Sequence, residues 1–112
     1  MKSICIAFCL TALAATSANA ETCYMEVDRQ IVMQGSCTFE ADADGSFRIM
    51  GNDYDDAAGT GHFAFVSLTE KGTAVGSWTG EGGAERAHAP LGQLFRNGGC
   101  WINDTARVCA WE

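Results

Sequence analysis

Apolar and polar residues alternate along several short stretches of this chain, which is the pattern of β-strands with one buried face. Cys37, Phe39 and Ala41 alternate with polar residues in one stretch. Phe47 and Ile49 alternate with polar residues in the next. No stretch of about a dozen residues shows the 3.6-residue period of an amphipathic helix. The pattern therefore predicts an all-β domain.

Turn signals divide the chain into short predicted strands. Tight turns are expected at Asp42–Gly45, Glu70–Gly72 and Asn97–Gly99. Longer loops are expected at Gly51–Gly61 and Gly80–Gly83, and Ala84–Pro90 favours one helical turn that its proline ends. The predicted strands are residues 23–27, 30–34, 37–41, 46–50, 62–69, 73–79, 91–96, 100–103 and 106–111. The fold class we predict is a small antiparallel β-barrel or β-sandwich of about seven to nine short strands.

The N-terminal segment, residues 1–20, has the features of a secretory signal peptide. It starts with a positive charge, continues with the apolar or small run Ile4–Ala15, and ends with Ala18 and Ala20 before the expected cut. The apolar run is too short to span a bilayer, and no other stretch is long enough. We therefore expect residues 21–112 to form one exported domain, periplasmic or extracellular, with no membrane span.

Four of the six cysteines lie beyond the predicted signal peptide. An even number in a small exported chain predicts two disulfides, although four cysteines permit three pairings. A two-residue turn at Asp104–Thr105 places Cys100 directly opposite Cys109, in a pair close enough to be bridged. No C-x-x-C pair is present, which disfavours a zinc site. The four cysteines beyond the predicted signal peptide are Cys23, Cys37, Cys100 and Cys109.

The local pairing, residue 23 with 37 and residue 100 with 109, is the one we favour. A turn at Asp28–Arg29 leaves Cys23 and Cys37 out of direct register. We therefore expect a β-bulge at Gly35–Ser36 to bring the first pair together.

Charge narrows the range of partners. The net charge is −7, and without Lys2 six basic residues stand against 14 acidic ones, which gives −8 for residues 21–112. Such a domain repels phosphate backbones and anionic lipid surfaces, so neither nucleic acid nor a membrane is an expected partner. The charge either keeps an exported protein soluble or steers the domain toward a basic protein.

Residue types that catalysis needs are scarce. His62 opens an apolar strand and is expected to pack or to lie at an edge. His88 follows Glu85 and Arg86, but no Ser or Cys nucleophile lies near it in a recognisable motif. The cysteines beyond residue 20 are expected to be oxidised and therefore not nucleophilic. We expect neither an enzyme nor a cofactor, and a small hydrolase is the disfavoured alternative.

Two acidic stretches invite comparison with calcium loops. Glu40–Gly45 has acids at alternate positions, but the twelfth position, where a bidentate Glu belongs, is Gly51. We expect a plain hairpin turn there. Asp53, Asp55 and Asp56 form either a solvated acidic loop or a weak calcium site, and we favour the solvated loop.

Large aromatic residues are plentiful for so small a domain. Trp101 and Trp111 flank cysteines and are expected to pack over a disulfide. Trp78 either fills the core or is exposed beside the glycine-rich segment that follows it, where it would suit an interface. The candidate binding face comprises Trp78, Glu81, Glu85, Arg86 and His88.

In size, export, acidity and disulfides the chain is similar to the periplasmic inhibitors of c-type lysozyme, which are small β-barrels that act on a basic enzyme. The active-site motif of that family is rich in serine and glycine and leads into a Lys-Tyr step. The nearest stretch here, Gly72–Trp78, lacks both the lysine and the tyrosine. The similarity therefore assigns no site residue in this chain.

Our leading hypothesis is a non-catalytic exported binding domain with a basic protein partner, of which a lysozyme-type enzyme is the most concrete case. The competing hypothesis is a structural or envelope-associated accessory domain without a specific ligand. An acidic concave face beside Trp78 would favour the first hypothesis.

Overall fold

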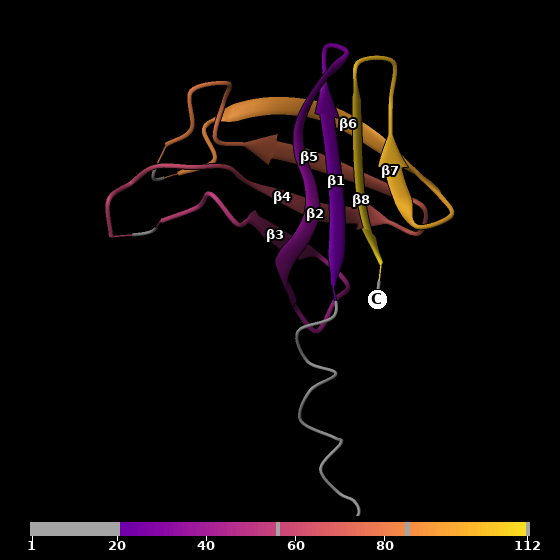
Figure 1. Cartoon of the computed structure of the whole chain (residues 1–112). Coiled ribbons are helices and arrows are strands. Elements are labelled where there is room, and N and C mark those ends of the chain that lie inside the picture. The colour runs from indigo at the N-terminus through magenta and orange to yellow at the C-terminus, as the bar shows by residue number, and fades with distance from the viewer. Residues whose placement is uncertain (1–20, 56, 85, 112) are drawn as a thin grey trace, which may run out of the picture.

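The computed structural model describes residues 21–55, 57–84 and 86–111. Eight strands in this part of the chain form a closed antiparallel barrel (Figure 1). Each strand pairs with the next one along the chain, and β1 closes the barrel by pairing with β8. The strands are β1 (Thr22–Val27), β2 (Gln30–Ala41), β3 (Phe47–Gly51), β4 (Phe63–Glu70), β5 (Thr73–Trp78), β6 (Ala89–Asn97), β7 (Cys100–Ile102) and β8 (Ala106–Trp111). The predicted all-β fold is confirmed. No helix in the described residues is long and apolar enough to cross a membrane.

Two local predictions of secondary structure are wrong. The stretches 30–34 and 37–41 belong to one strand, β2. Gly35 has a φ of 115° inside it, a conformation that glycine adopts without strain, and pairing with a neighbouring strand continues on both sides. The segment 84–90 forms no helical turn in its described residues, because Ala89 and Pro90 already pair with β5 as the first residues of β6.

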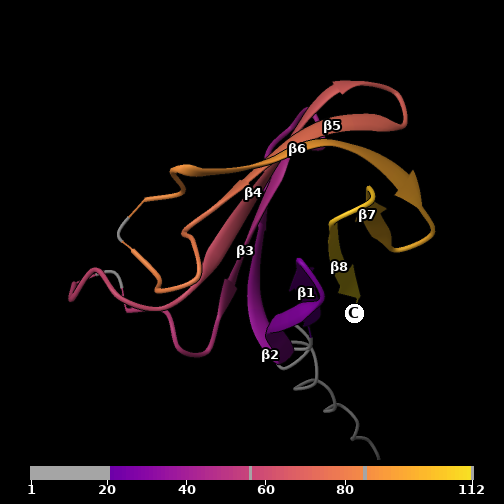
Figure 2. The same cartoon turned by 90° about the horizontal axis from the view of Figure 1, so that it is seen from above.

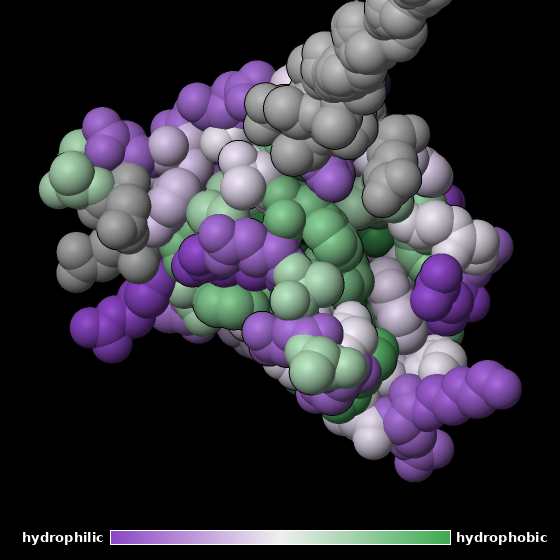
Figure 3. All heavy atoms as spheres, turned by 90° about the horizontal axis from the view of Figure 1, so that it is seen from below, coloured by the Kyte–Doolittle hydropathy of each residue, from purple (hydrophilic) through white to green (hydrophobic). Residues whose placement is uncertain are grey.

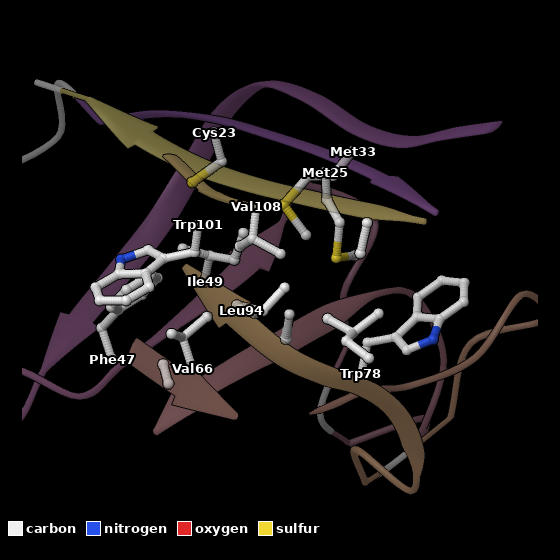
Figure 4. Close-up of a cluster of buried hydrophobic side chains, with 14 residues drawn as sticks. Cys23, Met25, Met33, Phe47, Ile49, Val66, Trp78, Leu94, Trp101 and Val108 are labelled. Carbon is white, nitrogen blue, oxygen red and sulfur yellow. The ribbon is translucent and has the colours of Figure 1, made fainter. Parts of the chain in front are cut away.

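Inward-facing side chains from all eight strands fill the barrel. Aromatic rings lie at the two ends of this core, with Phe47 and Trp101 at one end and Trp78 at the other (Figure 4). Burying each large aliphatic side chain between them stabilises the fold by about 1.5–3 kcal/mol. The large aliphatic residues that are fully buried are Met25, Ile49, Val66, Leu94 and Val108.

The two ends of the barrel are built differently (Figures 1 and 2). One end, here called the loop end, carries the long loops 52–62 and 79–88, which lie side by side. The opposite end, here called the hairpin end, carries the turns 42–46, 71–72 and 98–99 together with the first and last described residues. The loop end also carries the tight turns 28–29 and 103–105, so what distinguishes the two ends is the pair of long loops.

The local disulfide pairing is confirmed. Cys100 lies directly opposite Cys109 in the register of β7 and β8, as the predicted turn requires, with 4.0 Å between their Cα atoms. Successive side chains of a strand point to opposite faces, and Val108 is in the core. The Cys100–Cys109 bridge therefore lies on the outer face of the barrel.

The second bridge joins Cys23 to Cys37 on the inner side of the barrel. Cys23 pairs with Gly35 and belongs to the buried core, and Cys37 lies two residues further along β2. The expected bulge at Gly35–Ser36 is wrong, because the register shifts instead at Val32, next to the turn. A diagonal cross-strand position is close enough for a bridge without a bulge beside it, since the Cα atoms are 5.8 Å apart.

Candidate functional site

A hollow of about 270 Å³ opens at the loop end of the barrel. Its apolar lining comes from Val27, Val32 and Trp78, which pack in or against the core. Two carboxylate residues, Asp28 and Glu81, stand on its rim. The β1–β2 turn supplies one acid and the β5–β6 loop supplies the other, so barrel closure brings them to the same hollow.

Trp78 closes the core at this end. It shares the inward face of β5 with Ala74 and Gly76, and only 7% of its surface is exposed. The first of the two alternatives for this residue, a core position, is therefore confirmed, and the exposed position is wrong. A ring this buried offers a partner an edge in the hollow instead of a protruding anchor.

His62 joins the two long loops. Its Nδ1 lies 2.7 Å from a carboxylate oxygen of Asp53, and its Nε2 lies 2.9 Å from the backbone oxygen of Glu81. The imidazole also stacks on Trp78, with 6.1 Å between the ring centres and 20° between the planes. Both hydrogen-bond partners are acceptors, so only the doubly protonated ring donates to both.

The surroundings of His62 favour that charged form. Partial burial opposes protonation, but the hydrogen bonds to the Glu81 carbonyl and to the Asp53 carboxylate outweigh it. Together with the charge of Asp53 they raise the pKa of His62 above its ordinary value. The β5–β6 loop is thus held through the backbone of Glu81, by an imidazole whose protonation strengthens the contact.

The two loops also touch through glycine. Gly61 and Gly83 have φ angles of 90° and 77°, in the left-handed region. A Cβ atom at Gly83 would collide with the backbone of Gly61, and one at Gly61 would collide with the backbone of Asp53. Glycine at position 83 therefore allows the two loops to approach this closely, and glycine at position 61 allows the 52–62 loop to fold against itself at the same point.

The rim carboxylates have no described partner. Within residues 21–55, 57–84 and 86–111, the ion pairs are Arg48 with Glu40 and His62 with Asp53. Neither Asp28 nor Glu81 uses its side chain in a described hydrogen bond. Both carboxylates are therefore available to a ligand.

The predicted binding face divides in the structure. Trp78 and Glu81 line the hollow, whereas Arg86 and His88 are exposed and lie outside its lining. Glu85 lies outside the described residues. Sequence reasoning missed Asp28, which it placed only in a turn. The missing signal was the pairing of β1 with β8, which closes the barrel and brings that turn to the rim.

The acidic loop uses its carboxylates internally. Asp53 binds His62, and Asp55 accepts hydrogen bonds from the backbone of Ala57 and Ala58 at 3.1 and 3.2 Å. No group of three or more His, Cys, Asp or Glu in the described residues is arranged to hold a metal ion. Asp56, the third acid of this cluster, lies outside them.

The other tryptophans also differ from each other. Trp101 is buried in the same cluster as Cys23. Trp111 is 45% exposed, and its indole lies against Gly99, at a distance that leaves no space for a Cβ atom there. This contact is with the β6–β7 turn, at the residue next to Cys100.

Comparison of this chain with models of protein families, with characterised proteins and with solved structures gives no match. Its two disulfides are typical of proteins from oxidising compartments.

Proposed function

We propose that this protein is an exported, non-catalytic binding domain whose loop-end hollow receives a cationic side chain of a basic protein partner. The observation that carries this proposal is the pair of unpartnered carboxylates, Asp28 and Glu81, on the rim of an apolar hollow. The proposed setting is the periplasm or the extracellular space, where disulfides persist.

The chemistry of the hollow suits one lysine or arginine. A guanidinium or ammonium group forms charge-assisted hydrogen bonds with carboxylates, and these are about twice as strong as neutral ones. The methylene stem of the same side chain packs on apolar surface such as Val27 and Val32. A hollow of about 270 Å³ has room for one such side chain.

The net charge supports the same class of partner. A value of −7 for the whole chain raises the encounter rate with a basic protein, most strongly at low salt. A c-type lysozyme is the first partner to test, because it is a basic enzyme that acts on the cell wall and matches the similarity noted from the sequence. The alternative of an accessory domain without a ligand becomes an outcome of the same test.

The test measures lysozyme binding by the wild-type protein and by two double variants of equal charge. Asp28→Asn with Glu81→Gln removes both rim carboxylates, and Asp42→Asn with Glu70→Gln removes two exposed acids at the hairpin end. We expect the first variant to bind at least about tenfold more weakly, mainly through faster dissociation. The control should lose only about twofold, mainly in its salt-dependent association rate.

Equal losses in the two variants would show that only overall charge matters and would refute a site at the loop end. Absence of lysozyme binding, followed by absence of salt-sensitive capture of any basic protein from an envelope extract, would favour the accessory-domain alternative.

A further inference from the structure

The hairpin end of the barrel has a second hollow, of about 240 Å³, with a different chemistry. Apolar surface gathers near the centre of this side of the molecule, and polar side chains surround it (Figure 3). The lining residues are Phe39, Gly45, Phe47, Leu68, Arg96, Gly99, Trp101 and Ala110. Arg96 is the only charged member of this set.

The aromatic members form the floor and one wall. Phe47 and Trp101 are buried, with 8% and 6% of their surface exposed, so they form the floor of the hollow. The rings of Phe39 and Phe47 lie 5.2 Å apart, and Phe39 is only half-buried. A ligand with an apolar group therefore meets the half-exposed ring of Phe39 and the small exposed parts of Phe47 and Trp101.

A shallower hollow of about 200 Å³ continues the same surface, because it shares Phe39 and Ala110 with the first. Its remaining lining residues are Glu21 and the exposed Trp111. The apolar surface thus extends away from Arg96 toward Trp111, and the carboxylate of Glu21 borders this second hollow. A ligand that carries both an anionic and an apolar group has one favoured orientation here.

Arg96 is held across the mouth of the hollow. Its guanidinium carbon lies 5.6 Å from the centre of the Trp101 ring, and its Nε donates to the backbone oxygen of Gly98 at 2.8 Å. Among the described residues no carboxylate pairs with it. Both terminal NH₂ groups of the guanidinium therefore remain available, in the planar arrangement that suits a carboxylate.

We propose that the hairpin-end hollow binds a small amphipathic carboxylate. Its anionic group would bind the guanidinium of Arg96, and its short alkyl or aryl group would pack on Phe39, Phe47 and Trp101. This site is separate from the loop end and does not depend on the function proposed for it.

The charge of Arg96 favours an anionic ligand here although the surface as a whole is acidic. At physiological salt the Debye length is about 8 Å, so distant surface acids are largely screened, whereas a guanidinium in contact is not. The small size of the hollow limits the ligand to one ring or a short chain. For a ligand of about ten heavy atoms, the usual energy per atom gives a dissociation constant of about 0.1–10 mM.

The test is a titration of ¹⁵N-labelled, disulfide-bonded protein with octanoate, followed by NMR at the indole N–H of Trp101. Octylammonium has the same tail with the opposite charge, and butyrate has the same charge with a shorter tail. We expect saturable shifts of the Trp101 signal with octanoate and at least about fivefold weaker binding of both controls.

Two arginine variants locate the anionic group. Arg96→Gln should weaken octanoate binding at least about fivefold. The octanoate affinity of Arg96→Lys should lie between those of the wild type and Arg96→Gln, because lysine keeps the charge but loses the planar arrangement of donors. Arg107→Gln makes the same charge change on the outer face of β8 and should leave binding unchanged. The dispersion of the NMR spectrum establishes that each variant is folded.

Three results would overturn the proposal. They are octylammonium binding as tightly as octanoate, unchanged octanoate binding by folded Arg96→Gln, and the absence of a saturable shift at Trp101 up to about 50 mM octanoate, about five times the upper end of the expected dissociation constant.

Discussion

The two ends of this barrel close the same core in opposite ways. At the loop end, long connections are joined by His62 and by glycine contacts, and two carboxylates surround the hollow. At the hairpin end, tight turns leave aromatic surface open, and one arginine crosses it. Because the interior side chains are shared, the difference in surface chemistry comes from the connections and the rim residues. A small barrel can therefore carry two unlike recognition surfaces without a larger core.

The largest effect is expected from removing the aromatic residue that closes either end. Trp101→Ala and Trp78→Ala should each lower the free energy of unfolding by about 3–5 kcal/mol, because each leaves a large space in the core. Only Trp78→Ala should also speed hydrogen exchange in loops 52–62 and 79–88, since His62 loses the ring on which it stacks. Urea denaturation and exchange mass spectrometry measure the two effects.

A loss of less than about 1 kcal/mol in either variant would mean that the ring is not part of the core. Equal exchange rates in the loops of both variants would show that the two ends are not independent.

Loss of a disulfide should have the next largest effect. In the chain-entropy estimate, each bridge stabilises the fold by about 3 kcal/mol, equivalent to a shift of about 12–24 °C in Tm for a domain of this size. Cys23→Ser with Cys37→Ser should cost slightly more than Cys100→Ser with Cys109→Ser, because its bridge closes the longer loop, with a sequence separation of 14 against 9. Calorimetry of both variants tests the order, and the reverse order would contradict loop closure as the source of the difference.

Separating the two long loops should have a smaller effect on stability. Gly83→Ala places a Cβ atom against the backbone of Gly61 at a φ of 77°, which should cost about 1–3 kcal/mol. Gly82→Ala is the matched control, because a Cβ there meets nothing within 4 Å. Thermal unfolding measures the cost, and lysozyme binding should weaken for Gly83→Ala alone. Equal losses of stability and of lysozyme binding in Gly83→Ala and Gly82→Ala would show that the contact between the loops is not the cause of those losses.

The smallest effect is expected from pH. The pKa of His62 is raised in the folded state, so its contribution to stability is fully present below its ordinary pKa of 6.5 and is lost as pH rises through the raised value. Wild type and His62→Gln should therefore differ most in unfolding free energy near pH 5 and least near pH 9. His88→Gln removes an exposed histidine whose side chain has no described hydrogen bond and is the control. A difference that grows with pH would contradict the assignment.

Much of the fold was predictable because it depends on local spacing. Alternation placed Phe47 and Ile49 inside, and a two-residue turn placed Cys100 opposite Cys109. The same alternation places Trp78 with Ala74 and Gly76 on the inward face of β5, so its burial could have been predicted. The hollows depend instead on barrel closure.

The contact of His62 with residue 81 spans 19 residues, and Asp28 reaches the rim of that hollow only because β1 pairs with β8. No local pattern carries that information. A sequence therefore predicts which residues form the strands more readily than which loops meet.

His62 binds the backbone oxygen of residue 81 and leaves its side chain unused. Since every amino acid supplies the same carbonyl group, the loop keeps its anchor whichever residue occupies that position. The side chain at position 81 can therefore be replaced while the backbone contact that holds the loop stays the same. Exchanging Glu81 for a basic or an aromatic residue would change what the loop end selects without changing how the loop is held, which makes this position a starting point for altering specificity by evolution or by design.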